Sequence, residues 1–266
     1  MIIDFEFEDV KKFLPKRAIN SNKYDSGQLL IIGGDEKYPG AIILAAQMAI
    51  KSGVGLTYLY TKSQNVIKVL KEFPEIIVFD NHDRLAEILS DNIPILAGPG
   101  TLNNKWTRET YDLIKDKPIT TILDAAYIQE IKSINLFTTQ ILLPHEGEAA
   151  KLLNVPSSHV KEDRLRSVIE ISIKYNAVTV LKGPGTLISN GNETFCCMNG
   201  STALSTAGTG DVLAGLIASF LAQGLNPMKS CKLGVALHGH CAEKLNLKSG
   251  LMPSELINLI RGYINQ

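Results

Sequence analysis

The segment Gly208-Thr209-Gly210-Asp211 combines a flexible turn with a carboxylate, and a helical pattern follows it directly. Two glycines allow a sharp turn whose amide groups point outward, and with the dipole of a following helix they form a site for an anion. Asp211 could take the proton of an attacking hydroxyl group while the amides stabilise a phosphoryl group in transfer. Alternatively, Asp211 only complements the helix dipole. The segment alone leaves both interpretations open.

The helix that must position this turn is predicted over residues 209–223. Apolar residues recur there at helical spacing, and Gly224 stands where a helix commonly ends. The apolar positions are Val212, Leu213, Leu216, Ile217, Phe220 and Leu221.

Further candidate residues stand at the ends of predicted strands. Asp124, His145 and Lys182 each follow or end a short apolar run, and glycines do the same at Gly33-Gly34 and at residues 98–100. In open parallel sheets, ligands bind beyond the carboxyl ends of the strands. We therefore expect these residues to gather at one edge of a sheet.

Each of these side chains also has a purely structural interpretation. His145 could start a helix, Lys182 could be a solvated strand end, and Asp124 could be a cap or turn residue. The chain has no GxxxxGK[ST] segment, and the glycine spacing of residues 33–40 does not match the dinucleotide fingerprint. Neither a P-loop nor a Rossmann site is predicted.

The composition bounds the class of protein. With 266 residues and 45% hydrophobic content, the chain can bury a large core. Lys+Arg and Asp+Glu both count 27, so the formal net charge is zero. Nothing indicates a basic tract for nucleic acid or a membrane-surface helix, and a small-molecule pocket fits better.

The four cysteines, Cys196, Cys197, Cys231 and Cys241, have no CxxC spacing. Reduced thiols are expected, and these are typical of a reducing compartment. Residues 1–13 contain no apolar signal region, and no apolar run reaches transmembrane length. We expect a soluble cytoplasmic protein.

The chain alternates between short apolar strands and helical segments as far as residue 182. This alternation is typical of βαβ units, which form a parallel sheet with helices on both faces. Strands are predicted at residues 28–32, 56–60, 75–79, 94–97, 119–123, 140–143 and 178–182, and helices at 5–14, 41–51, 63–71, 85–89, 106–114, 148–153 and 164–175.

The pattern changes in the last third of the chain. Residues 186–189 and 193–198 flank an Asn-Gly-Asn turn, which predicts an antiparallel hairpin. No linker interrupts the sequence, so residues 1–266 are expected to form a single domain. The predicted fold is a three-layer α/β/α sandwich with a mostly parallel central sheet and this late hairpin. Helices complete the chain at 209–223, 228–246 and 253–264.

In chain order, the motifs resemble those of the ADP/ATP-dependent NAD(P)H-hydrate dehydratases, which have the ribokinase-like fold. The resemblance runs from Lys23 to Ile257, nearly the whole chain. Each motif is loose when taken singly, but all of them in this order are specific. The motifs are GPG at 98–100, PHEGE at 144–148, KGPGT at 182–186 and GTGD at 208–211.

The resemblance implies a role for each motif residue. Gly208, Thr209, Gly210 and Asp211 would form the catalytic turn. Glu148 falls where the wider superfamily has an acid linked to magnesium and phosphate, so it would serve the metal. The implied substrate contacts are Ala41, Gly100, Asp124, His145 and Asp211, and the implied nucleotide contacts are Lys182, Gly183, Pro184, Gly185, Thr186 and Gly210.

Three positions depart from the family pattern. The second acid of LDAD is Ala126, PHPGE contains Glu146, and KGAGT contains Pro184. The last two are expected to preserve their turns. Ala126 removes an acid that could contact the substrate or support a residue that does.

The activity that the resemblance implies is the dehydration of hydrated NADH or NADPH. Phosphorylation of the ring hydroxyl by ADP or ATP would create a good leaving group, and elimination of phosphate would restore the dihydronicotinamide. Asp211 would deprotonate the hydroxyl, the amides of Gly208–Gly210 would hold the phosphoryl group, and Mg²⁺ would offset phosphate charge.

Two other functions remain open from the sequence. A small-molecule kinase of the hydroxyethylthiazole kinase type would use the same turn but release a phosphorylated product. A non-catalytic nucleotide-binding protein would keep the turn without turnover, since a fold does not fix a function. The expected partners are hydrated NAD(P)H and ADP or ATP, without nucleic acid or membrane, and the resemblance implies a homo-oligomer, a tetramer.

Overall fold

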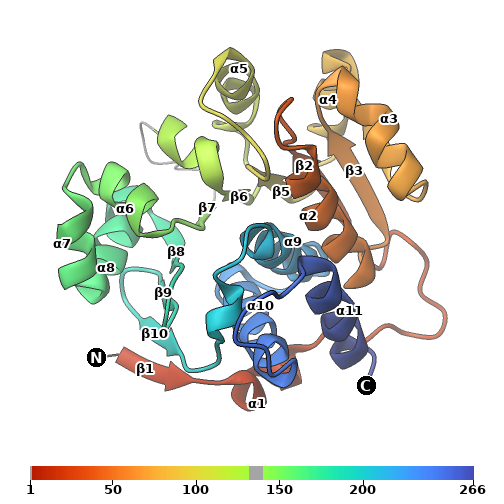
Figure 1. Cartoon of the computed structure of the whole chain (residues 1–266). Coiled ribbons are helices and arrows are strands. Elements are labelled where there is room, and N and C mark those ends of the chain that lie inside the picture. Colours follow the sequence, from red (N-terminus) through yellow and green to blue (C-terminus); the bar gives the residue numbers. More distant parts are fainter. Residues whose placement is uncertain (1, 132–139) are drawn as a thin grey trace.

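Among the residues that the structure describes, ten strands form one continuous sheet at the centre of the molecule (Figure 1). The structure is a computed structural model that describes residues 2–131 and 140–266. The strand order is β1-β10-β9-β8-β7-β6-β5-β2-β3-β4, and the strands from β8 to β4 along this order are parallel. The strands are β1 (Ile2–Phe5), β2 (Gln28–Ile32), β3 (Leu56–Tyr60), β4 (Ile77–Phe79), β5 (Ile95–Ala97), β6 (Thr121–Leu123), β7 (Gln140–Leu142), β8 (Ala177–Leu181), β9 (Leu187–Ser189) and β10 (Thr194–Cys197).

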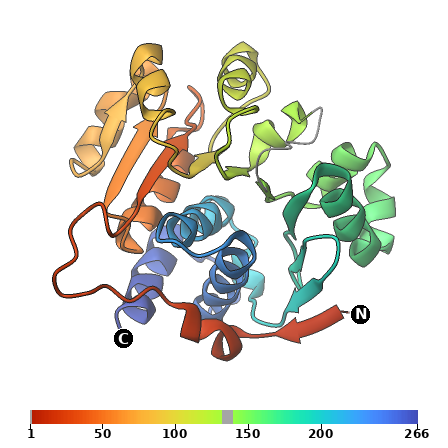
Figure 2. The same ribbon diagram turned by 180° about the vertical axis from the view of Figure 1, so that it is seen from behind.

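Helices cover both faces of the sheet, as the alternation of apolar strands and helices predicts (Figures 1 and 2). Successive strand residues point to opposite faces. In β2, Leu29 and Ile31 belong to one apolar core, whereas Leu30 and Ile32 belong to the other. The helices are α1 (Phe7–Val10), α2 (Pro39–Lys51), α3 (Ser63–Glu72), α4 (His82–Ile88), α5 (Lys105–Ile114), α6 (Glu146–Leu153), α7 (Ser157–Glu162), α8 (Arg164–Tyr175), α9 (Thr209–Ala222), α10 (Pro227–Lys244) and α11 (Pro253–Ile264).

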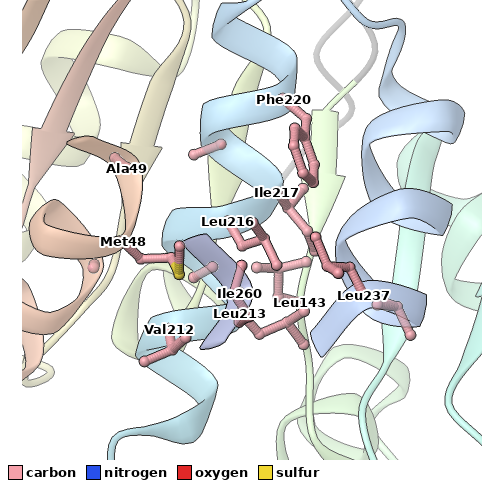
Figure 3. Packing of buried hydrophobic residues seen from close by; sticks show 14 of the residues in the cluster. Met48, Ala49, Leu143, Val212, Leu213, Leu216, Ile217, Phe220, Leu237 and Ile260 are labelled. Carbon is pink, nitrogen blue, oxygen red and sulfur yellow. The ribbon is translucent and has the colours of Figure 1, made fainter. Parts of the chain in front are cut away.

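Helix α9 is the centre of the larger core and lies between α2 and α10 (Figure 3). Its residues Leu216, Ile217 and Phe220 are fully buried, so the helix is apolar on almost every side. It approaches α2 closely, because a Cβ atom at Gly215 would lie 2.3 Å from the carbonyl oxygen of Ala45. The predicted apolar spacing therefore anchors the glycine turn in a rigid core.

The predicted hairpin is confirmed. Strand β9 is antiparallel to both β8 and β10, and Gly191 in the connecting turn has a φ of +88°. Residues 182–186 consequently form the short turn between β8 and β9. The predicted nucleotide loop is thus held at both ends by neighbouring strands.

The N-terminus differs from the helix predicted over residues 5–14. A strand, β1, precedes two short turns of helix, α1 and the 3₁₀ helix Lys11–Phe13. Strand β1 pairs in parallel with β10 at the sheet edge, and Phe5 packs edge-on against Phe195, with ring centroids 6.2 Å apart. The strand takes only Phe5 from the predicted helix, and residues 7–13 are helical as expected, in two short pieces. Helix α7 was also not predicted.

Candidate active site

The carboxyl ends of β2, β5, β6, β7 and β8 meet at one edge of the sheet, as predicted. The amide of Gly34 donates to the carbonyl of Pro99 over 2.9 Å, which joins the loops after β2 and β5. Gly98 has a φ of +143°, and a Cβ atom there would lie 2.2 Å from the carbonyl oxygen of Asp124. Glycine is therefore needed for β5 and β6 to end so close together.

Gly100 and Ala41, two residues of the predicted substrate pocket, also lie close together. Gly100 has a φ of +69°, and a Cβ atom there would lie 3.0 Å from the Cβ of Ala41. Ala126, where the family pattern has an acid, is 5% exposed and follows Ala125, whose φ is +49°. The chain thus turns sharply directly after Asp124.

Lys182 and Asp124 form an ion pair between the ends of β8 and β6, across the end of β7. The Lys182 Nζ lies 2.7 Å from Asp124 Oδ1, and the two side chains are 21% and 6% exposed. Removing two charges from water is costly unless they are paired. The interpretation of Lys182 as a solvated strand end is therefore wrong.

Two further carboxylates, Glu148 and Asp211, act on Lys182. Burial favours its neutral amine, yet the charges of Asp124, Glu148 and Asp211 together raise the pKa of Lys182. Burial raises the pKa of Glu148, the charge of Lys182 opposes this, and the charge of Asp124 adds to it. One ammonium group, at the end of β8, thus serves three carboxyl groups, contributed by the end of β6 and the first turns of α6 and α9.

Asp211 lies in the first turn of α9 with a pKa of about 7. Burial and then the charge of Asp124 raise this pKa, and the charge of Lys182 opposes the rise. A helix N-terminus alone favours the charged carboxylate and would not produce a raised value. A carboxyl group that titrates near neutral pH is suited to exchanging a proton with a ligand.

The turn before Asp211 leaves room for a ligand at one glycine and contacts the core at the other. Gly208 has a φ of +94°, and a Cβ atom there would lie 2.7 Å from Leu44 Cδ1. A Cβ atom at Gly210 would meet no atom of the described chain within 4 Å. The backbone at Gly210 is therefore open to close approach.

Thr209 and His238 hold this turn in place. The Thr209 hydroxyl donates to the carbonyls of Leu204 and Thr206, each over 2.8 Å. The His238 Nε2 donates to the Thr209 carbonyl over 3.0 Å, and burial lowers the pKa of His238 to about 4. His238 is a supporting residue that the sequence did not reveal, because a histidine in an apolar helix carries no distinctive pattern.

His145 begins helix α6 and forms a reciprocal cap with Glu148. Its Nδ1 accepts from the amides of Gly147, at 2.9 Å, and Glu148, at 3.3 Å, while Glu148 Oε2 accepts from the His145 amide at 2.9 Å. The helix-start interpretation is confirmed. The His145 side chain is 61% exposed, so its ring can still contact a ligand.

The loop of residues 182–186 has two glycines in the left-handed region of φ, Gly183 at +145° and Gly185 at +58°. The Thr186 hydroxyl closes the loop by donating to the Gly183 carbonyl over 2.9 Å. Arg164, at the start of α8, also holds the loop, by donating to the carbonyls of Pro184 and Gly185. Nothing in the local sequence indicated Arg164.

A cavity of about 580 Å³ connects the two loops. It is lined by residues 182–186, by Thr209 and Gly210, and by His238 of α10. A larger cavity of about 1080 Å³ lies at the opposite edge of the sheet, where helices end. There Arg17 donates to the Gly53 carbonyl, as expected for cations that satisfy helix ends. Of the candidate residues, the loop of residues 182–186 with Thr209 and Gly210 lines the smaller cavity, whereas Asp124, His145, Glu148 and Asp211 are not among its described lining residues.

The carboxylates of the site fit a magnesium ion that is held mainly by phosphate. Within residues 2–131 and 140–266, no group of three or more His, Cys, Asp or Glu side chains could hold a metal. Mg²⁺ at nucleotide sites often uses only one or two protein carboxylates, with phosphates and water as its other ligands. Glu148 Oε1, 3.6 Å from His145 Nε2, could supply one such oxygen.

A model of the NAD(P)H-hydrate dehydratase family matches residues 29–261. The chain belongs to the NAD(P)H-hydrate dehydratase family. It is 31% identical over 273 residues to the bifunctional NAD(P)H-hydrate repair enzyme Nnr of Coxiella burnetii, an alignment that covers 98% of this chain and 55% of that protein. The chain thus spans about half the length of this relative and of the Nnr enzymes of Vibrio cholerae and Escherichia coli, which it also matches.

Solved structures of the dehydratase family superpose along the whole chain. The ADP/ATP-dependent NAD(P)H-hydrate dehydratase of Bacillus subtilis, co-crystallised with ATP and Mg²⁺, has a TM-score of 0.90 at 26% identity and covers 99% of this chain and 98% of its own. A ribokinase-like superfamily protein of Enterococcus faecalis has a TM-score of 0.91 at 25% identity, with coverages of 99% and 95%. The predicted ribokinase-like sandwich is confirmed. No helix in the described part of the chain could cross a membrane.

Proposed function

We propose that this chain dehydrates hydrated NADH or NADPH back to the intact cofactor, with ADP or ATP as phosphoryl donor. Membership of the dehydratase family supports the reaction. The observation that carries the proposal is the cavity that the loop of residues 182–186 shares with Thr209 and Gly210, the two residues directly before Asp211. A donor on the loop and an acceptor hydroxyl near Asp211 could meet there.

The first step is phosphoryl transfer. Asp211 accepts the proton of the ring hydroxyl, and the hydroxyl oxygen attacks the terminal phosphorus of the nucleotide, so that a C–O–P bond forms. The bond to the nucleotide breaks, releasing ADP from ATP or AMP from ADP. The backbone amides of Gly208–Gly210 stabilise the negative charge that develops on the phosphoryl oxygens.

The second step is elimination of phosphate. The C–O bond breaks as the ring nitrogen donates its electron pair, and the adjacent ring carbon then loses a proton to form the double bond. Orthophosphate leaves with the oxygen that had been hydroxyl. Asp211 already carries the proton of the first step, so the departing phosphate accepts this second proton.

Other residues orient the two ligands. The backbone of residues 182–186, with Gly210, holds the nucleotide. Ala41, Gly100, Asp124 and His145 contact the hydrated dinucleotide. The Lys182 ammonium keeps the three surrounding carboxyl groups from repelling the substrate and each other. Glu148 would hold Mg²⁺, directly or through water, and the ion would neutralise phosphate charge.

Three further properties belong to this proposal. The continuous sheet supports a single domain over residues 1–266. A homotetramer and a cytoplasmic location are proposed from the family resemblance and from the four free cysteines. Light scattering of the purified protein tests the tetramer.

One assay tests the reaction against its alternatives. The protein is incubated with hydrated NADH, Mg²⁺ and either ADP or ATP, while the absorbance of NADH and the free phosphate are followed. We expect NADH and orthophosphate to appear in equal amounts. A stable phosphorylated product from a small alcohol, without NADH, would indicate a kinase, and nucleotide binding without any product would indicate a binding protein.

A further inference from the structure

Arg164 reaches from the start of α8 to the loop between β8 and β9. Its Nη1 donates to the carbonyls of Pro184 and Gly185, the latter over 3.4 Å, and its Nη2 donates to the carbonyl of Leu181 over 3.2 Å. A planar guanidinium group can satisfy several fixed acceptors at once, whereas an ammonium group cannot match this geometry. Arg164 therefore spans the loop from its first strand to its last glycine.

The position of Arg164 in its own helix makes this contact informative. It is the first residue of α8, after the cap Asp163, and a cation in the first turn of a helix opposes the helix dipole. Nothing in α8 itself therefore favours a positive charge there. The carbonyl groups of the loop supply the compensating acceptors.

Gly183 is shaped to admit the guanidinium group. A Cβ atom at this residue would lie 2.8 Å from Arg164 Nη2, and its φ of +145° is one that other residues rarely adopt. The backbone of the loop thus lies directly against Arg164. Even the single methyl group of an alanine at position 183 would have to displace either the loop or the Arg164 side chain.

Glu146 connects Arg164 to the turn that starts α6. Its Oε1 lies 3.5 Å from Arg164 Nε, and the side chains of Arg164 and Glu146 are 20% and 28% exposed. Within the described residues, this buried Nε has no hydrogen-bond partner, so Glu146 is the charge that offsets it. Glu146 stands between His145 and the metal candidate Glu148, in the turn predicted to contact the substrate. Two sequence departures, Glu146 and Pro184, therefore meet at one arginine.

We propose that Arg164 is a positioning residue that fixes the loop of residues 182–186 for nucleotide binding, and that Glu146 acts through it. The proposal rests on the assignment of this loop to ADP or ATP. Without the guanidinium group, three hydrogen bonds to the carbonyls of Leu181, Pro184 and Gly185 are lost, and the two glycines are free to sample other conformations. The nucleotide must then order the loop when it binds, which lowers its affinity.

The test uses calorimetric titration of the full-length protein with ATP and Mg²⁺, and hydrogen exchange of the loop amides. For Arg164→Met we expect an ATP affinity at least about tenfold weaker and faster exchange confined to residues 183–186. Arg164→Lys should restore little of the ATP affinity that Arg164→Met loses, because an ammonium group cannot match the geometry of the guanidinium group. Arg166→Met is the matched control, because Arg166 is an exposed arginine of the same helix that pairs with Glu170 instead. It should leave both measurements unchanged.

The role of Glu146 is tested by a double-mutant cycle. Glu146→Gln should weaken ATP binding by about two- to threefold in the wild-type chain and have no effect in the Arg164→Met chain, because it acts through the arginine. Additive losses would overturn this part of the proposal.

Other outcomes separate the positioning role from general stability and from the proposed function. An equal loss of affinity for ATP and hydrated NADH, together with faster exchange throughout β8, would show that Arg164 only stabilises the fold. Normal ATP binding by Arg164→Met would overturn the proposal while leaving the proposed function intact. A wild-type protein that binds neither ADP nor ATP would overturn both.

Discussion

Lys182 Nζ lies 2.7 Å from Asp124 Oδ1, and this buried ion pair links the end of β8 to the end of β6. The pair directs the lysine ammonium toward the carboxylates of the site, while the glycines that follow it in the chain line the cavity. The charge of Lys182 therefore lowers the pKa of Asp211. The charge of Asp124 raises that pKa.

This arrangement predicts opposite effects of two substitutions on the pH dependence of kcat. A base with a pKa of about 7 must be ionised to act, so the rate should rise as the pH rises through about 7. Lys182→Met removes a charge that lowers the pKa of Asp211, so the rise should move to higher pH by about one unit. Asp124→Asn removes a charge that raises this pKa, so the rise should move to lower pH. Shifts in the same direction in both variants would contradict the assigned charges.

Asp211 also predicts how folding stability depends on pH. Its folded-state pKa of about 7 lies above the ordinary aspartate value of 3.8, so the folded state binds the proton more tightly than the unfolded state. The stability that this group contributes is present below about pH 4 and is lost as the pH rises to about 7. Asp211→Asn should therefore be more stable than the wild type at about pH 8, by up to a few kcal/mol, and the difference should shrink toward pH 4. Urea unfolding across this range measures it. If the stability of Asp211→Asn relative to the wild type falls as the pH rises, the raised pKa of Asp211 is contradicted.

The donor loop is tested by Gly185→Val. Gly185 has a φ of +58°, and a Cβ atom there would touch Cys196 Sγ at 3.4 Å, so a branched side chain would strain the loop and crowd the cavity. We expect the affinity for ADP or ATP to fall by at least about tenfold and the affinity for hydrated NADH to change much less. Calorimetry that finds equal losses for the two ligands would remove the loop from the nucleotide site.

The helix crossing beneath the site predicts a stability effect. A Cβ atom at Gly215 would lie 2.3 Å from the Ala45 carbonyl oxygen, so Gly215→Ala must separate α9 from α2 and should cost about 1–3 kcal/mol. Gly262 in α11 is the matched control, because a Cβ atom there meets nothing within 4 Å in the described chain. Gly262→Ala should stabilise the protein by up to about 1 kcal/mol. Thermal unfolding of both variants should therefore show shifts of opposite sign.

The sequence was informative where the signal was local. The turn at Gly208–Asp211 could be placed at a helix start because glycines, the acid and the apolar spacing of α9 lie in one segment. Asp124 and Lys182 could be placed at strand ends. Their ion pair could not be predicted, because it depends on β6 and β8 flanking β7 in the sheet.

The supporting residues were missed for the same physical reason. Arg164 contacts a carbonyl 20 residues away in the chain, and His238 contacts one 29 residues away. Neither contact has a periodic pattern or a spacing rule. Likewise, β1 depends on its partner β10, almost 200 residues later in the chain, so no strand was predicted at residues 2–5.

The most direct test of the account is the turnover of hydrated NADH by Asp211→Asn. A general base contributes typically about 10²–10⁴-fold to a rate, whereas a carboxylate that only complements a helix contributes about 0.3–1 kcal/mol of stability. Asparagine has a similar shape but cannot accept the proton. The account predicts a folded variant that binds ATP normally and loses at least about a hundredfold in kcat, with a smaller change in substrate affinity. A folded Asp211→Asn protein with near wild-type kcat would contradict the central claim.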